Sequence, residues 1–213
     1  MTAITTPTYA LQQEELIQTD KIKKLLTKQA IEHPLGMPCY YAVLYYGKSY
    51  YGGRLSSVEY RKRWDRNEIK KTHKFITGLI HKCFGEEVPL WWCINRHDDY
   101  EDADGNCKKG SFHSDLYIGE IPDKAVERPF RFVKPSVIPI ALEDKKLFLL
   151  EACIRQSKWV GQYKNSLKIS KVPPEEFEQT FDYGLKDVNS SETFNEIVDW
   201  KNSNFYTQNK EKN

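Results

Sequence analysis

Residues 112–118 alternate between apolar and polar side chains, a pattern that predicts a β-strand. Successive side chains of a strand point to opposite faces, so His113 and Asp115 should leave the same face. The apolar positions share the other face: Phe112, Leu116 and Ile118. We therefore expect one face of this strand to pack on a core and the other to carry polar chemistry.

The other elements follow from similar patterns. Runs of apolar and aromatic residues predict three further strands, over 39–46, 90–97 and 166–172. Helical spacing of apolar residues predicts two helices, over 57–84 and 142–159. A last helix should follow Pro173 and Pro174, because an apolar stripe recurs there at every fourth residue: Phe177, Phe181 and Leu185. The order strand, helix, strand, strand, helix, strand, helix indicates an α+β fold, with an antiparallel sheet and helices packed on one face.

The 213 residues fit one domain with extensions. Residues 1–36 are expected to form an N-terminal extension with a polar helix, and residues 37–188 the domain. Residues 189–213 are expected to form a polar C-terminal tail, in which four apolar residues could dock as one last turn: Phe194, Ile197, Val198 and Trp200.

Composition excludes some classes of protein. No apolar run approaches the roughly 18 residues that a membrane span needs, and the first residues lack the order of a signal peptide. The five cysteines include no close CxxC pair, which favours reduced thiols and a cytoplasmic location over a disulfide framework or a structural zinc. The sequence also lacks a P-loop, so any unwinding of duplex DNA would require a helicase partner.

A second histidine, His97, ends the strand before an Asp-rich loop that leads to His113. If the two strands are antiparallel neighbours, both imidazoles and Asp115 converge, with Asp99 of the loop nearby. Imidazole and carboxylate ligands together indicate a divalent cation. The alternative interpretation is an ordinary pair of hydrogen-bonded histidines beside a solvated acidic loop.

This segment resembles the metal-binding motif of HUH-superfamily replication initiators, in particular the rolling-circle Rep proteins of small Gram-positive plasmids. The matching residues are His97, Asp98, Gly105, Lys108, Lys109, Phe112 and His113. The chain departs from the pattern at three positions. Asp115 stands at the place of the second strand histidine, Ser114 replaces the hydrophobe before it, and Tyr100 occupies a place where the family often has an Asp ligand. Asp115 is still a competent ligand for Mn²⁺ or Mg²⁺, and Asp99 could substitute at the position lost to Tyr100.

The resemblance implies a ferredoxin-like or RRM-like HUH nuclease architecture and a tyrosine nucleophile on a helix after the metal strands. Tyr183 and Lys186 form the expected Tyr-x-x-Lys pair, on the side of the last helix away from its apolar stripe. Gly184 lies toward the stripe, where its lack of a side chain would let the helix approach the sheet. Tyr163 is the alternative nucleophile, although it lacks that pairing.

The implied function is a site-specific single-stranded DNA endonuclease and strand transferase that initiates rolling-circle replication of a plasmid or virus. Metal-assisted attack by the tyrosine would give a 5′-phosphotyrosine, with single-stranded or hairpin origin DNA as substrate and a host helicase and polymerase as partners. Net charge is only +2, but basic residues gather before and beside the metal motif, and we expect six of them to bind DNA: Arg61, Lys62, Arg63, Arg66, Lys108 and Lys109. A solvated helix face would explain the first four equally well. The alternatives are a non-catalytic nucleic-acid-binding protein on a decayed HUH scaffold and a metal nuclease that uses activated water.

Overall fold

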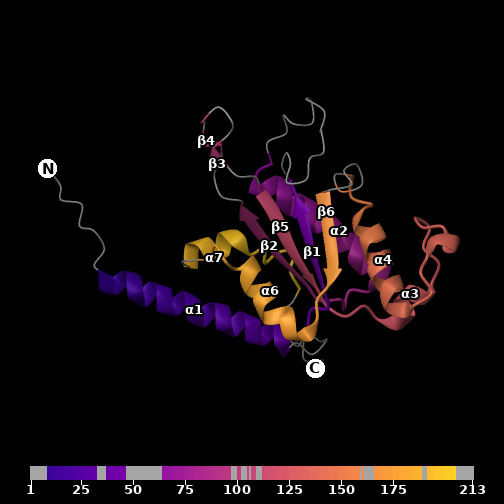
Figure 1. Cartoon of the computed structure of the whole chain (residues 1–213), viewed down its shortest axis with the longest axis horizontal. Helices are drawn as coiled ribbons and strands as arrows, with labels where there is room; N and C mark the ends of the chain where they lie inside the picture. The colour runs from indigo at the N-terminus through magenta and orange to yellow at the C-terminus, as the bar shows by residue number, and fades with distance from the viewer. Residues whose placement is uncertain are drawn as a thin grey trace, which may run out of the picture.

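The computed structural model describes residues 9–32, 37–46, 64–96, 100–101, 105, 107–108, 112–158, 160, 166–188 and 191–204. A four-stranded sheet lies at its centre (Figure 1). Its strands, in spatial order, are β2 (Leu90–Arg96), β5 (Phe112–Ile118), β1 (Tyr40–Tyr45) and β6 (Leu167–Lys171). Every neighbouring pair is antiparallel. The alternation over 112–118 therefore gave the bounds of β5, and the expected pairing of β2 with β5 is confirmed.

The first face of the sheet packs against α2 (Arg66–Phe84) and α4 (Leu142–Ile154). Helix α2 begins where the side chain of Asp65 accepts a hydrogen bond from the amide of Glu68, at 2.9 Å. It ends at Gly85, whose φ of 117° is open to glycine but strained for other residues. Between these limits one stripe of α2 is buried in the core: Ile69, Ile76, Ile80 and Phe84.

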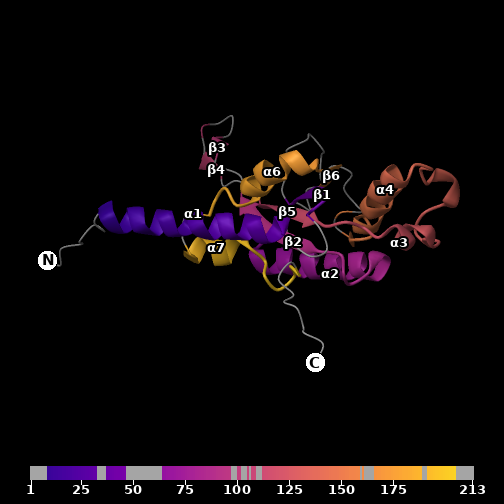
Figure 2. The same ribbon diagram turned by 90° about the horizontal axis from the view of Figure 1, so that it is seen from below.

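The second face is also covered, by α6 (Phe177–Gly184) and by the end of α1 (Tyr9–Ile31). Figure 2 shows α6 and α2 on opposite sides of the sheet, and Figure 1 shows α1 running beyond the sheet at its N-terminal end. The expectation of helices on one face only is therefore wrong. The second face also needs a cover because Trp91 and Cys93 of β2 point away from α2. Phe181 of α6 supplies part of that apolar cover.

Short elements connect the main ones. A two-stranded ladder of β3 (Tyr100–Glu101) and β4 (Cys107–Lys108) lies between β2 and β5 in the chain. The Pro-rich stretch after β5 contains α3 (Asp123–Glu127) and the short 3₁₀ helix η2 (Pro135–Val137). A second 3₁₀ turn, η4 (Pro174–Glu176), precedes α6, as expected from its two prolines.

The C-terminal segment is part of the fold up to Asn204. Helix α7 (Ser191–Ile197) buries Phe194 and Ile197 beside the second face, so the expected docked turn is present. The chain then follows the outer edge of β2: the Asp199 amide donates to the Trp92 carbonyl, and the Asn204 amide to the Leu90 carbonyl, both at 3.0 Å. These bonds occupy backbone groups of β2 that face away from β5.

Three buried polar side chains join this segment to the first face of the sheet. His73 of α2 lies 2.7 Å from Asp199 through Nδ1 and 2.7 Å from Ser114 of β5 through Nε2. Its ring stacks on Trp92, with centroids 4.0 Å apart. Ser114 is the residue that replaced a hydrophobe in the metal motif, and His73 supplies the hydrogen-bond partner that a hydroxyl in a core requires. The connectivity is that of a hydrolase triad, but the Ser114 side chain is fully buried, so we assign the cluster a structural role.

Candidate functional site

The candidate site lies on the second face of the sheet, where β5 presents His113 and Asp115. Both side chains are almost fully buried, with 1 % and 0 % of their surface exposed. His113 Nε2 lies 3.6 Å from Asp115 Oδ2. The shared face that the alternation predicted is therefore confirmed, but it is covered rather than open.

Asp115 is held by two donors. The Tyr41 hydroxyl donates to Oδ1 at 2.5 Å, and the Asn95 side-chain amide donates to Oδ2 at 2.6 Å. Burial raises the pKa of Asp115 to about 6, against the opposing effect of the two hydrogen bonds. A carboxylate whose charge is disfavoured in this way is stabilised by any cation that approaches it.

Asn95 of β2 connects β5 to α6. Its amide nitrogen also donates to the carbonyl of Gly184, the last residue of α6, at 2.9 Å. The other amide atom, Oδ1, is buried and accepts no hydrogen bond from the residues that the structure describes. One side chain thus ties Asp115 to the end of α6 and leaves an oxygen with unused acceptor capacity.

Tyr183 and Lys186 stand at that end of α6. Phe177, Phe181 and Leu185 are buried, whereas Tyr183 is 50 % exposed, so the predicted separation of stripe and tyrosine is confirmed. The Lys186 ammonium lies over the Tyr183 ring, 4.6 Å from its centroid. Lys186 also lowers the free energy of the ionised form of Asp115 through its charge.

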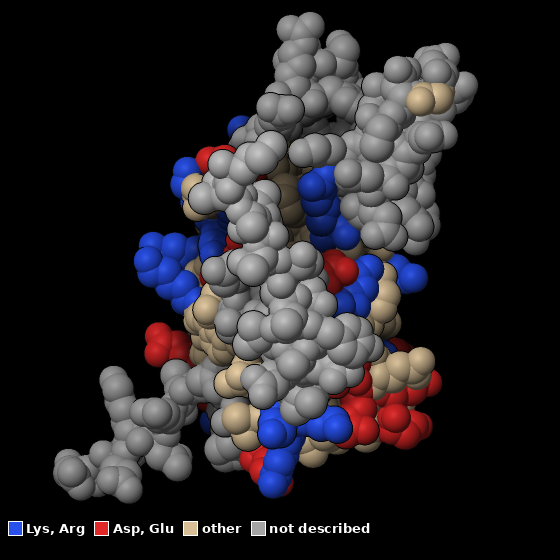
Figure 3. Space-filling model, turned by 90° about the vertical axis from the view of Figure 1, so that its left-hand side faces the viewer, with Lys and Arg blue, Asp and Glu red and all other residues tan. Residues whose placement is uncertain are grey.

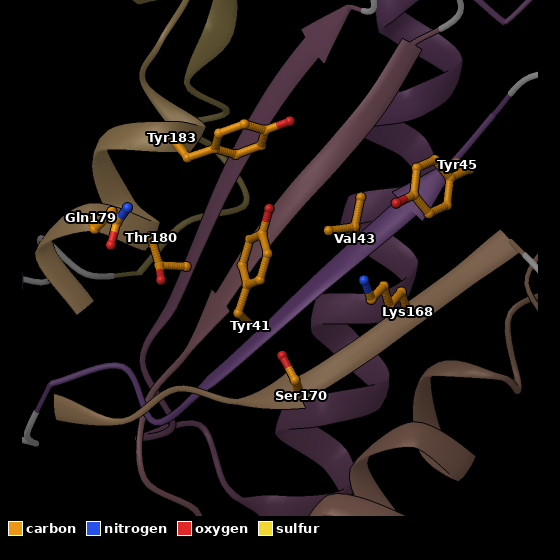
Figure 4. A pocket seen from close by; sticks show the side chains of 8 residues that line it. All are labelled: Tyr41, Val43, Tyr45, Lys168, Ser170, Gln179, Thr180 and Tyr183. Carbon is orange, nitrogen blue, oxygen red and sulfur yellow. The ribbon is translucent and has the colours of Figure 1, made fainter. Parts of the chain in front are cut away.

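An open cavity of about 410 Å³ begins at Tyr183. The cavity lies between α6 and the two strands β1 and β6. Its volume is typical of sites that bind small ligands. Figure 4 shows Tyr41 of β1 and Tyr183 of α6 pointing into the same space, with Lys168 and Ser170 across it. The remaining lining residues are Val43, Tyr45, Gln179 and Thr180.

Tyr41 and Asn95 were missed in the sequence analysis. Asn95 stands two residues before His97, so the same period-two argument that grouped His113 with Asp115 could have found it. Tyr41 gave no such signal, because six tyrosines crowd residues 40–51 and only the pairing of β1 with β5 selects one. Its hydroxyl remains protonated, since burial and the nearby Asp115 charge raise the pKa of Tyr41 well above its usual range.

The donor set of this face suits a hard divalent cation. It offers a carboxylate, an amide oxygen and an imidazole, which Mn²⁺ and Mg²⁺ accept. The 3.6 Å between His113 Nε2 and Asp115 Oδ2 is near the roughly 3 Å that separates adjacent ligands of an octahedral ion with bonds of about 2.1 Å. Within the described ranges no group of three or more His, Cys, Asp or Glu is found, so this pair would need further ligands.

Several predicted residues lie outside the described part of the chain. These are the metal ligands His97 and Asp99, the basic residues Arg61, Lys62, Arg63 and Lys109, and the alternative nucleophile Tyr163. Lys108 belongs to β4, where its backbone pairs with Tyr100. The structure thus brings His113, Asp115, Tyr183 and Lys186 to one face and leaves the other ligands as predictions.

The basic residues of α2 do not join this face. Helix α2 packs on the first face, and Arg66 at its start pairs with Glu196 of α7 at 2.9 Å and lies over the Phe112 ring. Lys71 pairs with Glu68 on the same helix. Figure 3 shows Lys and Arg mixed with Asp and Glu among the described residues of the view it presents. These contacts favour the solvated-helix interpretation of α2 over a DNA-binding role.

Gly184 permits the close approach of α6 to the sheet. A Cβ built on it would lie 2.3 Å from the Tyr117 hydroxyl and 3.0 Å from its ring, so the expected close approach is confirmed.

We predict that Gly184→Ala lowers the free energy of unfolding by about 1–3 kcal/mol, because either α6 or the Tyr117 ring must shift. Urea unfolding measures this change. The matched control is Gly78→Ala on the exposed side of α2, where nothing lies within 4 Å; it should raise stability by about 0.5–1 kcal/mol. Equal effects at both glycines would contradict the packing argument.

None of the described helices is long and apolar enough to cross a bilayer. Comparison of the chain with models of known protein families, with curated proteins and with solved structures found no match, so its family is not identified and its function must be argued from the residues of this site.

Proposed function

We propose that the protein is a metal-dependent enzyme that nicks and rejoins single-stranded DNA, and that it initiates rolling-circle replication as a relative of the HUH endonucleases. One observation carries the proposal: Asn95 bonds both Asp115 of β5 and the backbone of Gly184, beside Tyr183. The two motifs singled out in the sequence, which are about 70 residues apart, therefore meet on one face. The β-α-β-β-α-β order of the main elements, a ferredoxin-like arrangement, also supports the proposal.

Each group has a role in the proposed reaction. The phenol of Tyr183 gives up its proton to solvent and its oxygen attacks the scissile phosphorus; the bond from phosphorus to the 3′ oxygen breaks, and that oxygen takes a proton from solvent and leaves as a 3′ hydroxyl. Lys186, above the Tyr183 ring, favours the phenolate and attracts the phosphate. His113 and Asp115, with His97 and Asp99 as further predicted ligands, would hold Mn²⁺ or Mg²⁺, which polarises the phosphodiester and neutralises developing charge.

A covalent-trapping assay tests the proposal. The protein is incubated with Mn²⁺ and a pool of random single-stranded oligonucleotides labelled at the 3′ end, because a 5′-phosphotyrosine retains the 3′ fragment. The expected result is a labelled band at the size of the protein on a denaturing gel. Sequencing of the trapped fragments would then give the preferred cleavage site, and peptide mapping would give the tyrosine.

A non-catalytic nucleic-acid-binding protein is the second candidate. It is favoured by one observation: both oxygens of Asp115 already accept hydrogen bonds from protein groups, so the carboxylate needs no cation to be satisfied. Retention of the oligonucleotides without cleavage or adduct would support this candidate. Cleavage without adduct would instead support a nuclease that activates water.

Metal binding gives a separate prediction. If the cation binds at Asp115, free Mn²⁺ at 100 times its Kd should raise the free energy of unfolding by about 2.7 kcal/mol and Tm by about 5–10 °C. Thermal unfolding with and without Mn²⁺ measures this shift. The shift should disappear in Asp115→Asn and persist in Asp20→Asn, which changes an exposed carboxylate on α1. A shift of the same size in both variants would place the cation elsewhere.

A further inference from the structure

The cavity beside Tyr183 combines an aromatic surface with polar groups of a neighbouring strand. Strands β1 and β6 line one side of it and α6 lines the other (Figure 4). In the register of β1 with β6, Tyr41 lies directly opposite Ser170. Val43, two residues further along β1, lies opposite Lys168. Because side chains paired in this way share a face, with Cβ atoms about 5 Å apart, an aromatic ring lies next to a hydroxyl and an ammonium group.

The ring of Tyr41 is held in place by two contacts. It stacks on the Tyr117 ring, with centroids 5.1 Å apart, and its hydroxyl donates to Asp115. Tyr183 of α6 points into the same space as Tyr41 (Figure 4). Aromatic side chains bind nucleobases by stacking, and a ring that is already fixed loses little conformational entropy when a base binds. This part of the cavity therefore suits a planar ring such as a base.

The charge of the cavity indicates an anionic ligand. Lys168 is exposed and forms no ion pair within the described part of the chain, whereas Lys171 of the same strand pairs with Glu143. None of the described residues that line the cavity is acidic, and Asp115 is buried behind Tyr41. Ammonium and hydroxyl groups are donors that commonly bind phosphate. The cavity thus offers rings for a base and, beside them, donors for a phosphate.

We propose that this cavity binds one nucleotide. Its base lies against the rings of Tyr41 and Tyr183. Its phosphate accepts hydrogen bonds from Lys168 and Ser170. The volume of about 410 Å³ lies within the range of small-ligand sites, and the cavity is open, so a strand can continue beyond the bound nucleotide. The inference rests on the proposed function, because a nucleotide held beside Tyr183 adjoins the phosphate that Tyr183 attacks; a free mononucleotide has the same chemistry.

Titrations followed by nuclear magnetic resonance test the inference. The full-length, isotope-labelled protein is titrated in EDTA, without any metal, with thymidine 5′-monophosphate, thymidine, inorganic phosphate and the trinucleotide of thymidine. We expect saturable shifts of the backbone amides around the cavity, in β1, β6 and α6. Thymidine and inorganic phosphate should each bind about tenfold more weakly than the monophosphate, or worse, because each lacks one of the two contacts. Binding of the trinucleotide that is tighter by about tenfold or more identifies a nucleotide within a strand as the ligand, whereas equal affinity identifies the free nucleotide.

Variants of the lining residues give the second part of the test. Lys168→Met should weaken binding of the monophosphate about fivefold or more. Lys124→Met, at an exposed position on α3, is the matched control and should leave it unchanged. Tyr183→Leu should weaken binding about fivefold or more, whereas Tyr183→Phe keeps the ring and should bind normally. The dispersion of the amide resonances shows that each variant is folded.

Three results would overturn the inference: no saturable shift around the cavity, equal affinity for inorganic phosphate and the monophosphate, or equal effects of Lys168→Met and Lys124→Met. Its failure is distinct from that of the proposed reaction. Normal nucleotide binding without any protein–DNA adduct would contradict the reaction alone. Adduct formation without nucleotide binding at the cavity would contradict this inference alone.

Discussion

Replacing Tyr183 by Phe is expected to abolish the protein–DNA adduct, with a loss of more than about 10³-fold in the rate of its formation. The substitution removes only the hydroxyl of a side chain that is half exposed, so the fold should be retained. Because the phenolic oxygen is the atom that bonds to phosphorus in the proposed reaction, no residual activity of this kind should remain. The covalent-trapping gel measures the effect.

Two further variants make this result specific. Tyr163→Phe should form adduct at the normal rate, whereas Lys186→Met should slow the reaction without abolishing it, because it removes the charge above the Tyr183 ring. If Tyr183→Phe retained the adduct and Tyr163→Phe lost it, the nucleophile would be Tyr163 and the role assigned to the end of α6 would be wrong.

The second large effect concerns stability. We expect His73→Ala to lower the free energy of unfolding by about 3–5 kcal/mol and Tm by about 10 °C, because it leaves Asp199 and Ser114 buried without their shared partner. Denaturant unfolding measures the change. Lys74→Ala, at an exposed position on the same helix, is the matched control and should change stability by no more than about 0.5 kcal/mol. Similar values for the two variants would show that the buried cluster contributes little.

The same cluster should make the protein sensitive to acid. Burial lowers the pKa of His73, so the unfolded chain takes up a proton below about pH 6.5 that the folded chain resists. Burial alone would raise the pKa of Asp199, but the hydrogen bonds from His73 and Asn202 outweigh it and lower the pKa. The contribution of His73 is therefore complete above about pH 6.5 and decreases as pH falls below that value, whereas the contribution of Asp199 decreases only below the ordinary carboxyl pKa of about 4. The stability difference between the unchanged protein and His73→Ala should shrink accordingly.

The sequence predicted the main elements well because their signals are local. Strand β5 follows from alternation alone, and the start of α6 follows from two prolines and an apolar stripe. The bounds of two helices were less well predicted. Helix α4 ends at Ile154, earlier than expected, and α2 begins at Arg66, later than expected. Element ends depend on capping and packing, which periodicity does not report.

The rest could not be predicted, because it depends on residues far apart in the chain. His73 and Asp199 are 126 positions apart, and no short-range pattern pairs them. The cover on the second face of the sheet depends on which strand neighbours which, since β5 lies between β2 and β1. The candidate site contains one predictable and one unpredictable contact. Strand alternation grouped His113 with Asp115, whereas the hydrogen bond from Tyr41 to Asp115 depends on the register of β1 against β5.

The segment from Val198 to Asn204 has a consequence for how the chain can be shortened. Without it, the outer edge of β2 would expose unpaired amides and carbonyls beside a run of apolar residues, Leu90–Ile94. Such an edge is a template on which a second chain can add a strand, the usual first step toward aggregation. This segment thus protects the sheet from self-association, and a protein truncated after α6 would lose that protection even if its candidate site stayed intact.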